Sequence, residues 1–299
     1  MKPKRLKIGS RIGIVSVSDS LPSPDDEGLL KGIDNLKAMG FDIVLGKNIC
    51  SNAPAERAKD FNEMFLRNDI DAIICSKGGN TAQEVLEFID WKLVEKNPKI
   101  FMGLSDITVF LNAIYAKTGL ITFHGNEITQ GFGKQFNPYG KDEFEKRLMN
   151  AEASEIPING ERKTIIKGVA EGILLGGNIR CLLKLKGTEY WPDFEGAVLM
   201  LEAYHLTPKE CREFFSELKE LDVFEKISGL LIGHIYGMQI EHPKDEQMKE
   251  IILEFIKDKP ILKCNDFGHN IPNATFPIGA RVRIDATNKK IELIEEFVE

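Results

Sequence analysis

An α/β fold with a doubly wound, mostly parallel sheet is predicted for the first part of this chain. Short apolar runs typical of buried strands alternate with segments whose apolar residues recur at helical spacing. Glycine-containing turns follow two of the runs, at residues 76–81 and 103–106. Beyond residue 168 the strands and helices continue without regular alternation, so we expect a separate, smaller α/β domain there.

The first 125 residues repeat a strand-then-helix rhythm. The expected elements are a strand at 11–18, a helix at 29–39 closed by Gly40, a strand at 41–45, a helix at 55–67, a strand at 72–75, a helix through about Ile89, a strand at 100–102 and a helix that buries Ile107, Phe110, Leu111 and Ile114. Ligands bind such sheets outside the carboxyl ends of the strands, so the turns after 72–75 and 100–102 are expected to share one cleft.

The second part of the chain begins after a polar stretch. Residues 126–167 are rich in turn formers, and we interpret them as a connection between domains 1–125 and 168–299, with one short helix around 142–149. The later expected elements are strands at 197–201, 229–233 and 281–285 and amphipathic helices at 208–221 and 245–256.

The composition is typical of a globular protein that does not bind nucleic acid. Hydrophobic residues make up 42% of the 299 residues, and 39 basic against 46 acidic residues give a net charge of −7. Five scattered cysteines without metal-ligand spacing favour reduced thiols in the cytoplasm. We see no signal peptide and no apolar run long enough to span a membrane, so we expect a cytoplasmic protein without membrane contact.

Ser105 lies where a strand turns into a helix with almost no loop. Such a turn lifts one side chain clear of the sheet at the positive end of the helix dipole, where a hydroxyl can attack an acyl carbon. The turn departs from the Gly-x-Ser-x-Gly pattern because residue 107 is isoleucine. The alternative is that Ser105 is only a helix N-cap.

The pair Gly78-Gly79 also has two interpretations. Paired glycines let backbone N–H groups approach a phosphate or an oxyanion, but they also occur in tight turns that need positive φ. With a phosphate there, the chain would be a non-enzymatic phosphate- or nucleotide-binding protein, although no Walker lysine spacing supports that. A second pair, Gly176-Gly177, has no assigned chemistry.

A nucleophilic serine needs a base and an orienting acid. His269 is a reasonable base, because it lies beside glycine in a loop, residues 265–272, with prolines on both sides. Taken singly, a structural role is the simpler interpretation for this or any other histidine: His124, His205, His234 and His242. Glu202 ends an apolar strand and is a candidate acid, with a solvated strand end as the alternative. The order serine, acid, histidine is that of α/β-hydrolases.

Several further blocks lie in order along nearly the whole chain: Arg11-Ile-Gly-Ile-Val, Ser76-Lys-Gly-Gly-Asn with Phe88-Ile-Asp90, Asn97-Pro-Lys with Gly103-Leu-Ser-Asp-Ile-Thr108, Gly119-Leu with His124-Gly125, Gly172-Ile-Leu-Leu-Gly-Gly-Asn178, Leu199-Met-Leu-Glu202, and Phe267-Gly-His269 with Pro277-Ile-Gly279. As an ordered set they resemble the serine peptidase family of the murein L,D-carboxypeptidases and microcin C self-immunity peptidases.

The resemblance implies roles for five residues. Ser105 matches the family's nucleophile, Glu202 the acid and His269 the base, and the backbone N–H groups of Gly79 and Asp106 match the oxyanion hole. It also implies an N-terminal Rossmann-like domain, a C-terminal domain that carries the acid and base, a homodimer, and no metal or cofactor.

Two departures from the family pattern bear on the substrate. Ala203 follows the acid where many members have aspartate, and Lys77 and Asn80 flank the glycine pair where the carboxypeptidase branch often has arginine and tyrosine. We expect hydrolysis of the L,D bond to a terminal D-amino acid in a cytoplasmic murein peptide. The alternative substrate is an aminoacyl or peptidyl nucleotide analogue, for which Trp191 is either a base platform or a packing residue.

Overall fold

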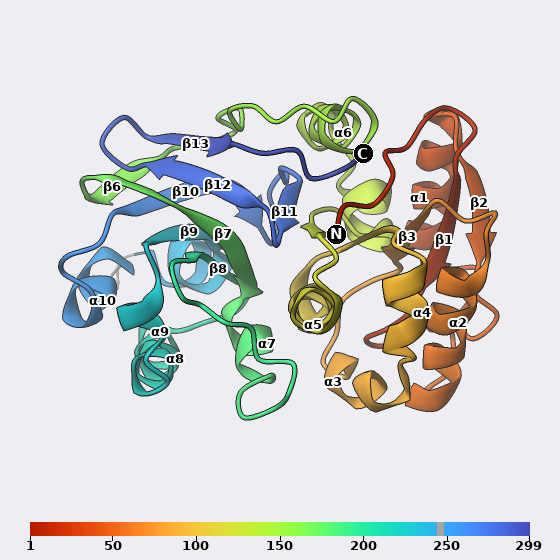
Figure 1. Ribbon diagram of the computed structural model, residues 1–299, viewed down its shortest axis with the longest axis horizontal. Coiled ribbons are helices and arrows are strands. Elements are labelled where there is room, and N and C mark those ends of the chain that lie inside the picture. The colour runs from red at the N-terminus through yellow and green to blue at the C-terminus, as the bar shows by residue number, and fades with distance from the viewer. Residues whose placement is uncertain (244–247) are drawn as a thin grey trace.

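The protein consists of two β-sheets surrounded by helices. The computed structural model describes residues 1–243 and 248–299. The first sheet has six strands in the order β11-β5-β4-β3-β1-β2, and the second has seven in the order β13-β12-β7-β8-β9-β10-β6. The sheets lie on opposite sides of helix α5, Thr108–Thr118 (Figure 1). The predicted α/β class with a mostly parallel sheet is therefore confirmed.

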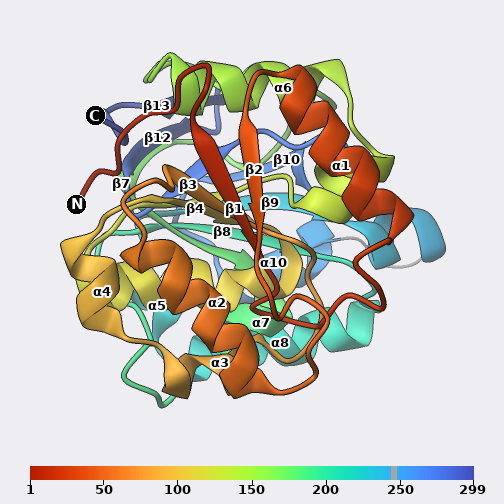
Figure 2. The same ribbon diagram turned by 90° about the vertical axis from the view of Figure 1, so that its right-hand side faces the viewer.

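The first sheet follows the predicted rhythm. Its strands are β1 (Arg11–Val15), β2 (Asp42–Leu45), β3 (Ala72–Cys75), β4 (Ile100–Gly103), β5 (Thr122–His124) and β11 (Phe276–Ile278). Its helices are α1 (Glu27–Ala38), α2 (Pro54–Leu66), α3 (Ala82–Val85), α4 (Trp91–Lys96) and α5. Strands β1 to β5 pair in parallel, and α1 and α2 lie on opposite sides of β1 and β2 (Figure 2). Because both faces are covered, β3 and β4 are buried throughout.

The second sheet has a parallel centre and antiparallel edges. Its strands are β6 (Lys163–Ile166), β7 (Val169–Asn178), β8 (Val198–Ala203), β9 (Gly229–Ile235), β10 (Ile261–Gly268), β12 (Arg281–Asp285) and β13 (Lys290–Leu293). Its helices are α7 (Ile179–Leu183), α8 (Pro208–Glu220), α9 (Val223–Lys226) and α10 (Met248–Phe255). The predicted start of the last helix, residue 245, lies outside the described residues. Strands β7 to β10 pair in parallel, so their carboxyl ends meet at one edge.

Short helical segments fill the connections. They are α6 (Pro138–Phe144), the 3-10 turns η1 (Leu86–Phe88) and η2 (Ser105–Ile107), and the π-helices η3 (Ile128–Lys134), η4 (Glu145–Met149) and η5 (Gly237–Glu241). No helix within residues 1–243 and 248–299 is long and apolar enough to cross a membrane.

Several strands were not predicted, and two interpretations are wrong. Residues 265–268, expected in a loop, are the end of β10, and 281–285 is not the last strand because β13 follows. The polar residues Lys263, Asn265 and Asp266 break the apolar pattern of β10. The stretch expected as a connection contains β6, which pairs with β10.

The chain crosses between the sheets more than once. Strand β11 lies late in the sequence, yet it pairs antiparallel with β5, with Phe276 opposite His124. The division into segments 1–125, 126–167 and 168–299 stays a prediction, and the chain's path joins its first and last segments within one sheet.

Helix α5 joins the sheets through direct hydrogen bonds to β7. The amide of Asn112 donates to the carbonyl of Gly176 (2.9 Å) and accepts from its N–H (3.0 Å). The N–H of Asn178 donates to the hydroxyl of Thr108 (2.9 Å). A Cβ on Gly177 would lie 2.5 Å from that hydroxyl oxygen, so the pair Gly176-Gly177 permits this close packing.

Candidate active site

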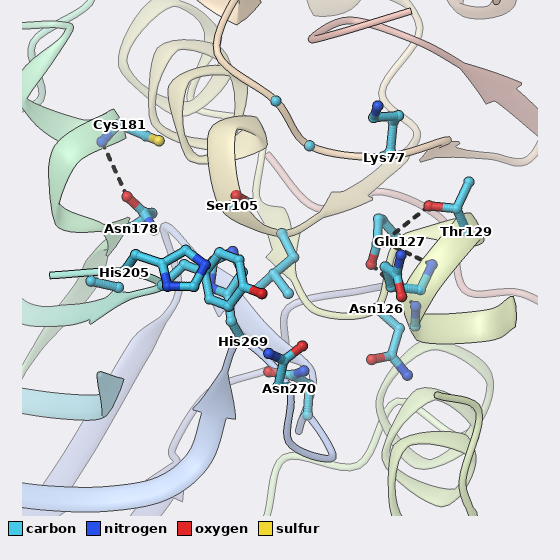
Figure 3. Close-up of a pocket in the computed structure, with 18 of the residues that line it drawn as sticks. Lys77, Ser105, Asn126, Glu127, Thr129, Asn178, Cys181, His205, His269 and Asn270 are labelled. Atoms are coloured by element: carbon cyan, nitrogen blue, oxygen red, sulfur yellow. Dashed lines mark hydrogen bonds between the residues drawn. The ribbon is translucent and has the colours of Figure 1, made fainter. Parts of the chain in front are cut away.

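A cavity of about 440 Å³ lies where the carboxyl ends of strands from both sheets meet. It is lined by residues that follow β3 and β4 in the first sheet and β8 and β10 in the second, including Gly79 and Tyr204. Ser105 and His269 also line it (Figure 3). The expectation that the two glycine-containing turns share one cleft is therefore confirmed.

Ser105 has the backbone geometry of a sharp strand-to-helix turn. Its φ is +66°, in the left-handed region that a residue with a Cβ adopts at a cost of about 1–2 kcal/mol. Its side chain caps neither the 3-10 turn nor α5, whose N-cap positions are Leu104 and Ile107. The N-cap interpretation is thus wrong, and the hydroxyl faces the cavity (Figure 3).

The glycine pair after β3 is packed against this turn. A Cβ on Gly78 would lie 2.8 Å from the Cβ of Ser105, and a Cβ on Gly79, whose φ is +151°, would overlap the side chain of Asp19. Asp19 in turn accepts a hydrogen bond from the N–H of Asn80 (2.9 Å). The pair therefore does more than form a turn, because the missing side chain of Gly78 allows the glycine turn to pack directly against Ser105.

Glu202 and His269 form a buried, hydrogen-bonded pair. Nδ1 of His269 lies 2.6 Å from Oε2 of Glu202, and the Asn178 amide donates to Oε1 (3.0 Å). Glu202 has no exposed surface, so it is not a solvated strand end. A carboxylate only accepts, so Nδ1 carries the proton and Nε2 of His269 is left to accept one from the cavity.

The contact between Glu202 and His269 raises the pKa of the histidine and lowers the pKa of the glutamate. Burial alone would lower the pKa of His269, but the charge of Glu202 and their hydrogen bond raise it above its ordinary value. Burial would likewise raise the pKa of Glu202, and the charge and hydrogen bond of His269 outweigh this and lower it. Glu202 is therefore ionised at neutral pH, as an orienting acid must be.

Three further residues fix the position of His269. Nδ1 of His234 donates to the carbonyl of His269 (2.9 Å), and the side chain of Asn273 accepts from the N–H of Gly268 (2.8 Å). The ring of Tyr204 stacks on the imidazole with centroids 4.9 Å apart and an interplanar angle of 10°. The imidazole can therefore hardly turn away from Glu202.

His124 and His205 have surroundings that differ from those of His269. His124 is fully buried against Phe267, and neither of its ring nitrogens meets a hydrogen-bond partner within the described ranges. Burial lowers the pKa of His124 to about 4, so it is neutral at pH 7. His205 lines the cavity and pairs with Glu241 at 2.6 Å. Among residues 1–243 and 248–299, no three or more His, Cys, Asp or Glu side chains gather as metal ligands would.

Sequence reasoning did not single out several residues of this cavity. Glu127 is a buried carboxylate whose pKa is raised by burial, and it caps η3 by accepting from the N–H of Gln130 (2.9 Å). Asn178 and Tyr204 act on Glu202 and His269 from neighbouring strand ends. The only sequence signal for these residues is that they lie next to the predicted motifs in the chain. Trp191 packs against Phe194, with centroids 5.1 Å apart, and does not line the cavity.

The fold is an α/β architecture of two sheets, and its cavity brings Ser105 together with a histidine that is paired with a buried glutamate. Models of the LD-carboxypeptidase N-terminal and C-terminal domains match residues 12–125 and 171–284. The chain belongs to the LD-carboxypeptidase family, which also contains the microcin self-immunity proteins, and the predicted family is confirmed.

Relatives come from both branches of the family. The microcin C7 self-immunity protein MccF of Escherichia coli is 30% identical, with 98% of this chain and 95% of that protein covered. A probable murein peptide carboxypeptidase of Bacillus subtilis (strain 168) is 28% identical, with 99% and 95% covered. The structure of MccF in complex with glutamyl sulfamoyl guanosine matches with a TM-score of 0.89 at 28% identity, covering 100% of this chain and 99% of that one.

Proposed function

We propose that this protein is a serine carboxypeptidase in which Ser105, Glu202 and His269 form the catalytic triad. The 2.6 Å contact between His269 and a fully buried Glu202, at the cavity that Ser105 lines, carries the proposal. Membership of a peptidase family supports the same reaction class.

The reaction follows from the roles of these three residues. Nε2 of His269 takes the proton from the Ser105 hydroxyl as its oxygen attacks the amide carbonyl carbon. The N–H groups of Gly79 and Asp106 donate to the oxyanion that forms. His269 then gives its proton to the leaving amine as the C–N bond breaks. Water, losing a proton to His269, attacks the acyl ester and releases Ser105.

The proposed substrate is a cytoplasmic murein peptide that ends in a D-amino acid joined by an L,D bond. The similarity to a murein tetrapeptide carboxypeptidase of Pseudomonas aeruginosa, which is 26% identical, supports this choice. Four of the five free cysteines are buried, which fits a reducing compartment. A homodimer, which the family resemblance implies, is proposed with it, and light scattering of the purified protein tests that state.

A second candidate substrate is an aminoacyl or peptidyl nucleotide analogue. The similarity to MccF, seen in complex with glutamyl sulfamoyl guanosine and with adenosine monophosphate, favours it. So do Lys77 and Asn80, which flank the glycine pair and line the cavity.

Mass-spectrometric hydrolysis of two substrates tests both candidates. Wild type and Ser105→Ala are incubated with a murein tetrapeptide ending in D-alanine and with an acidic aminoacyl-sulfamoyl adenosine. Serine-dependent release of D-alanine supports the murein peptidase. Cleavage of the adenylate alone supports the immunity peptidase. Equal turnover by wild type and Ser105→Ala contradicts the triad.

A further inference from the structure

The two proposed oxyanion donors belong to separate segments of the chain. Gly79 lies in the turn between β3 and α3, and Asp106 lies at the start of the turn that leads into α5. An oxyanion hole works only when both N–H groups point at the same place, within about 2.7–3.1 Å of the oxyanion. Something besides the covalent chain must therefore fix the two segments relative to each other.

The side chain of Asp106 makes the first connection. It is fully buried, and its Oδ2 accepts from the N–H of Ala82 (2.9 Å) and from the hydroxyl of Ser18 (2.6 Å). Ala82 begins α3, three residues after Gly79, so this carboxylate ties the serine turn to the glycine turn. A fully buried carboxylate is costly unless it is hydrogen-bonded and paired with a positive charge.

Lys184 supplies that charge from the other sheet. It directly follows α7, and its Nζ donates to Oδ1 of Asp106 (2.5 Å) and to the carbonyl oxygen of Asn80 (2.9 Å). Asp106 is itself one proposed donor, and Asn80 is the neighbour of the other. One ammonium group, only 20% exposed at the side chain, thus contacts both segments of the proposed hole.

We propose that Lys184 is a positioning residue that holds the oxyanion hole in its working geometry. The hole then forms only when α7 is docked against the serine turn, which makes catalysis depend on the contact between the two halves of the molecule. This inference rests on the proposed serine hydrolase mechanism and does not depend on which substrate is cleaved. The competing explanation is that the Lys184–Asp106 pair only stabilises the fold.

Three measurements on Lys184→Met separate these explanations, with Lys186→Met as the matched control. Lys186 lies two residues away and pairs with Glu217 on the exposed surface. If Lys184 positions the hole, kcat falls by about 10²-fold while KM changes little, because the hole acts on the transition state. Binding of a peptide aldehyde, whose adduct with Ser105 bears the oxyanion, weakens by a similar factor. The rate at which a fluorophosphonate labels Ser105 also falls.

Chemical rescue provides a readout that a purely structural role would not give. In Lys184→Ala, added ethylamine or propylamine should restore part of kcat and of the labelling rate by placing an ammonium group beside Asp106. The melting temperature of each variant is recorded, so that a loss caused by unfolding is recognised.

The outcomes are distinct. The inference is overturned if Lys184→Met keeps the kcat, the aldehyde affinity and the labelling rate of the wild type. It is also overturned by a variant whose kcat loss tracks its melting temperature and is not rescued by amine. If wild type labels at Ser105 but cleaves neither substrate, the substrate proposals fail while labelling still tests Lys184. If wild type is neither labelled nor active, the hydrolase mechanism fails, and the inference with it.

Discussion

Individual residues at this site are held in conformations that an ordinary surface position would not keep. Ser105 has a left-handed backbone, Glu202 is an ionised group without exposure, and the imidazole of His269 is enclosed by Tyr204. The left-handed backbone and the buried charge each cost free energy in the folded state. Two predictions follow from their physical chemistry.

The pH dependence of kcat/KM should report the raised pKa of His269. The base must be neutral to accept a proton, so activity is lost as pH falls through its pKa, and the acid limb should lie above the ordinary value of about 6.5. In Glu202→Gln the negative charge is gone, so the limb moves to lower pH while kcat falls by about 10³–10⁴-fold. Steady-state rates of wild type and Glu202→Gln across pH 5–9 measure the position of the acid limb and the loss of kcat. An unchanged limb in Glu202→Gln would show that this pair does not control the base.

The backbone strain at Ser105 should be visible in stability. Ser105→Ala and Ser105→Gly both lose turnover, but glycine tolerates a φ of +66°. We expect Ser105→Gly to be more stable than Ser105→Ala by about 1 kcal/mol in urea unfolding, since glycine avoids the clash of a Cβ in the left-handed region. Equal or reversed stabilities would mean that the turn is relaxed in solution.

The helices and strands differ in how accurately their bounds could be predicted from the sequence. Strands β3 and β12 coincide with the predicted ranges, helix α2 is shifted by one residue at both ends, and α8 ends one residue early, because each has a clear apolar run or period. Strand β11 has three residues including Pro277, and β7 ends in Gly176-Gly177-Asn178, so neither was recognised as a strand. Their places are set by pairing with distant strands, which a local pattern does not encode.

The contact between α5 and β7 should contribute strongly to stability. Asn112 is fully buried and satisfies both backbone groups of Gly176. Asn112→Ala leaves these groups without partners, and we expect a loss of about 2–4 kcal/mol in the free energy of unfolding. Asn62→Ala is the control, because Asn62 bonds Phe88 and Asp90 in an exposed setting and should cost about 1 kcal/mol or less. Similar losses in both variants would contradict a special role for this contact.

At the scale of the whole molecule, the sequence predicted which residues matter and left open how they meet. Ser105, Glu202 and His269 were expected from their turns and strand ends, and the structure places all three at the cavity or beside it. The supporting residues Lys184 and His234 carry no local signal, since their partners lie 35 to 104 residues away in the chain. Strand pairing within the second sheet brings His234 to His269, and the packing of the two sheets brings Lys184 to Asp106.

The two sheets should unfold together. Strand β11 crosses into the first sheet, and α5 and Lys184 tie each sheet to the other. We therefore expect a single calorimetric transition whose van't Hoff and calorimetric enthalpies agree. Two resolved transitions, or a stable isolated fragment of residues 1–125, would show that the sheets fold independently.

The late position of β11 has a consequence for biosynthesis. Residues 276–278 form the edge strand of the sheet that bears Ser105, and they emerge from the ribosome after every other strand of that sheet. His269, which activates the serine in the proposed mechanism, emerges only shortly before them. A nascent chain therefore carries an unfinished first sheet and, under the proposed mechanism, a serine without its base until residues 269–278 have been synthesised.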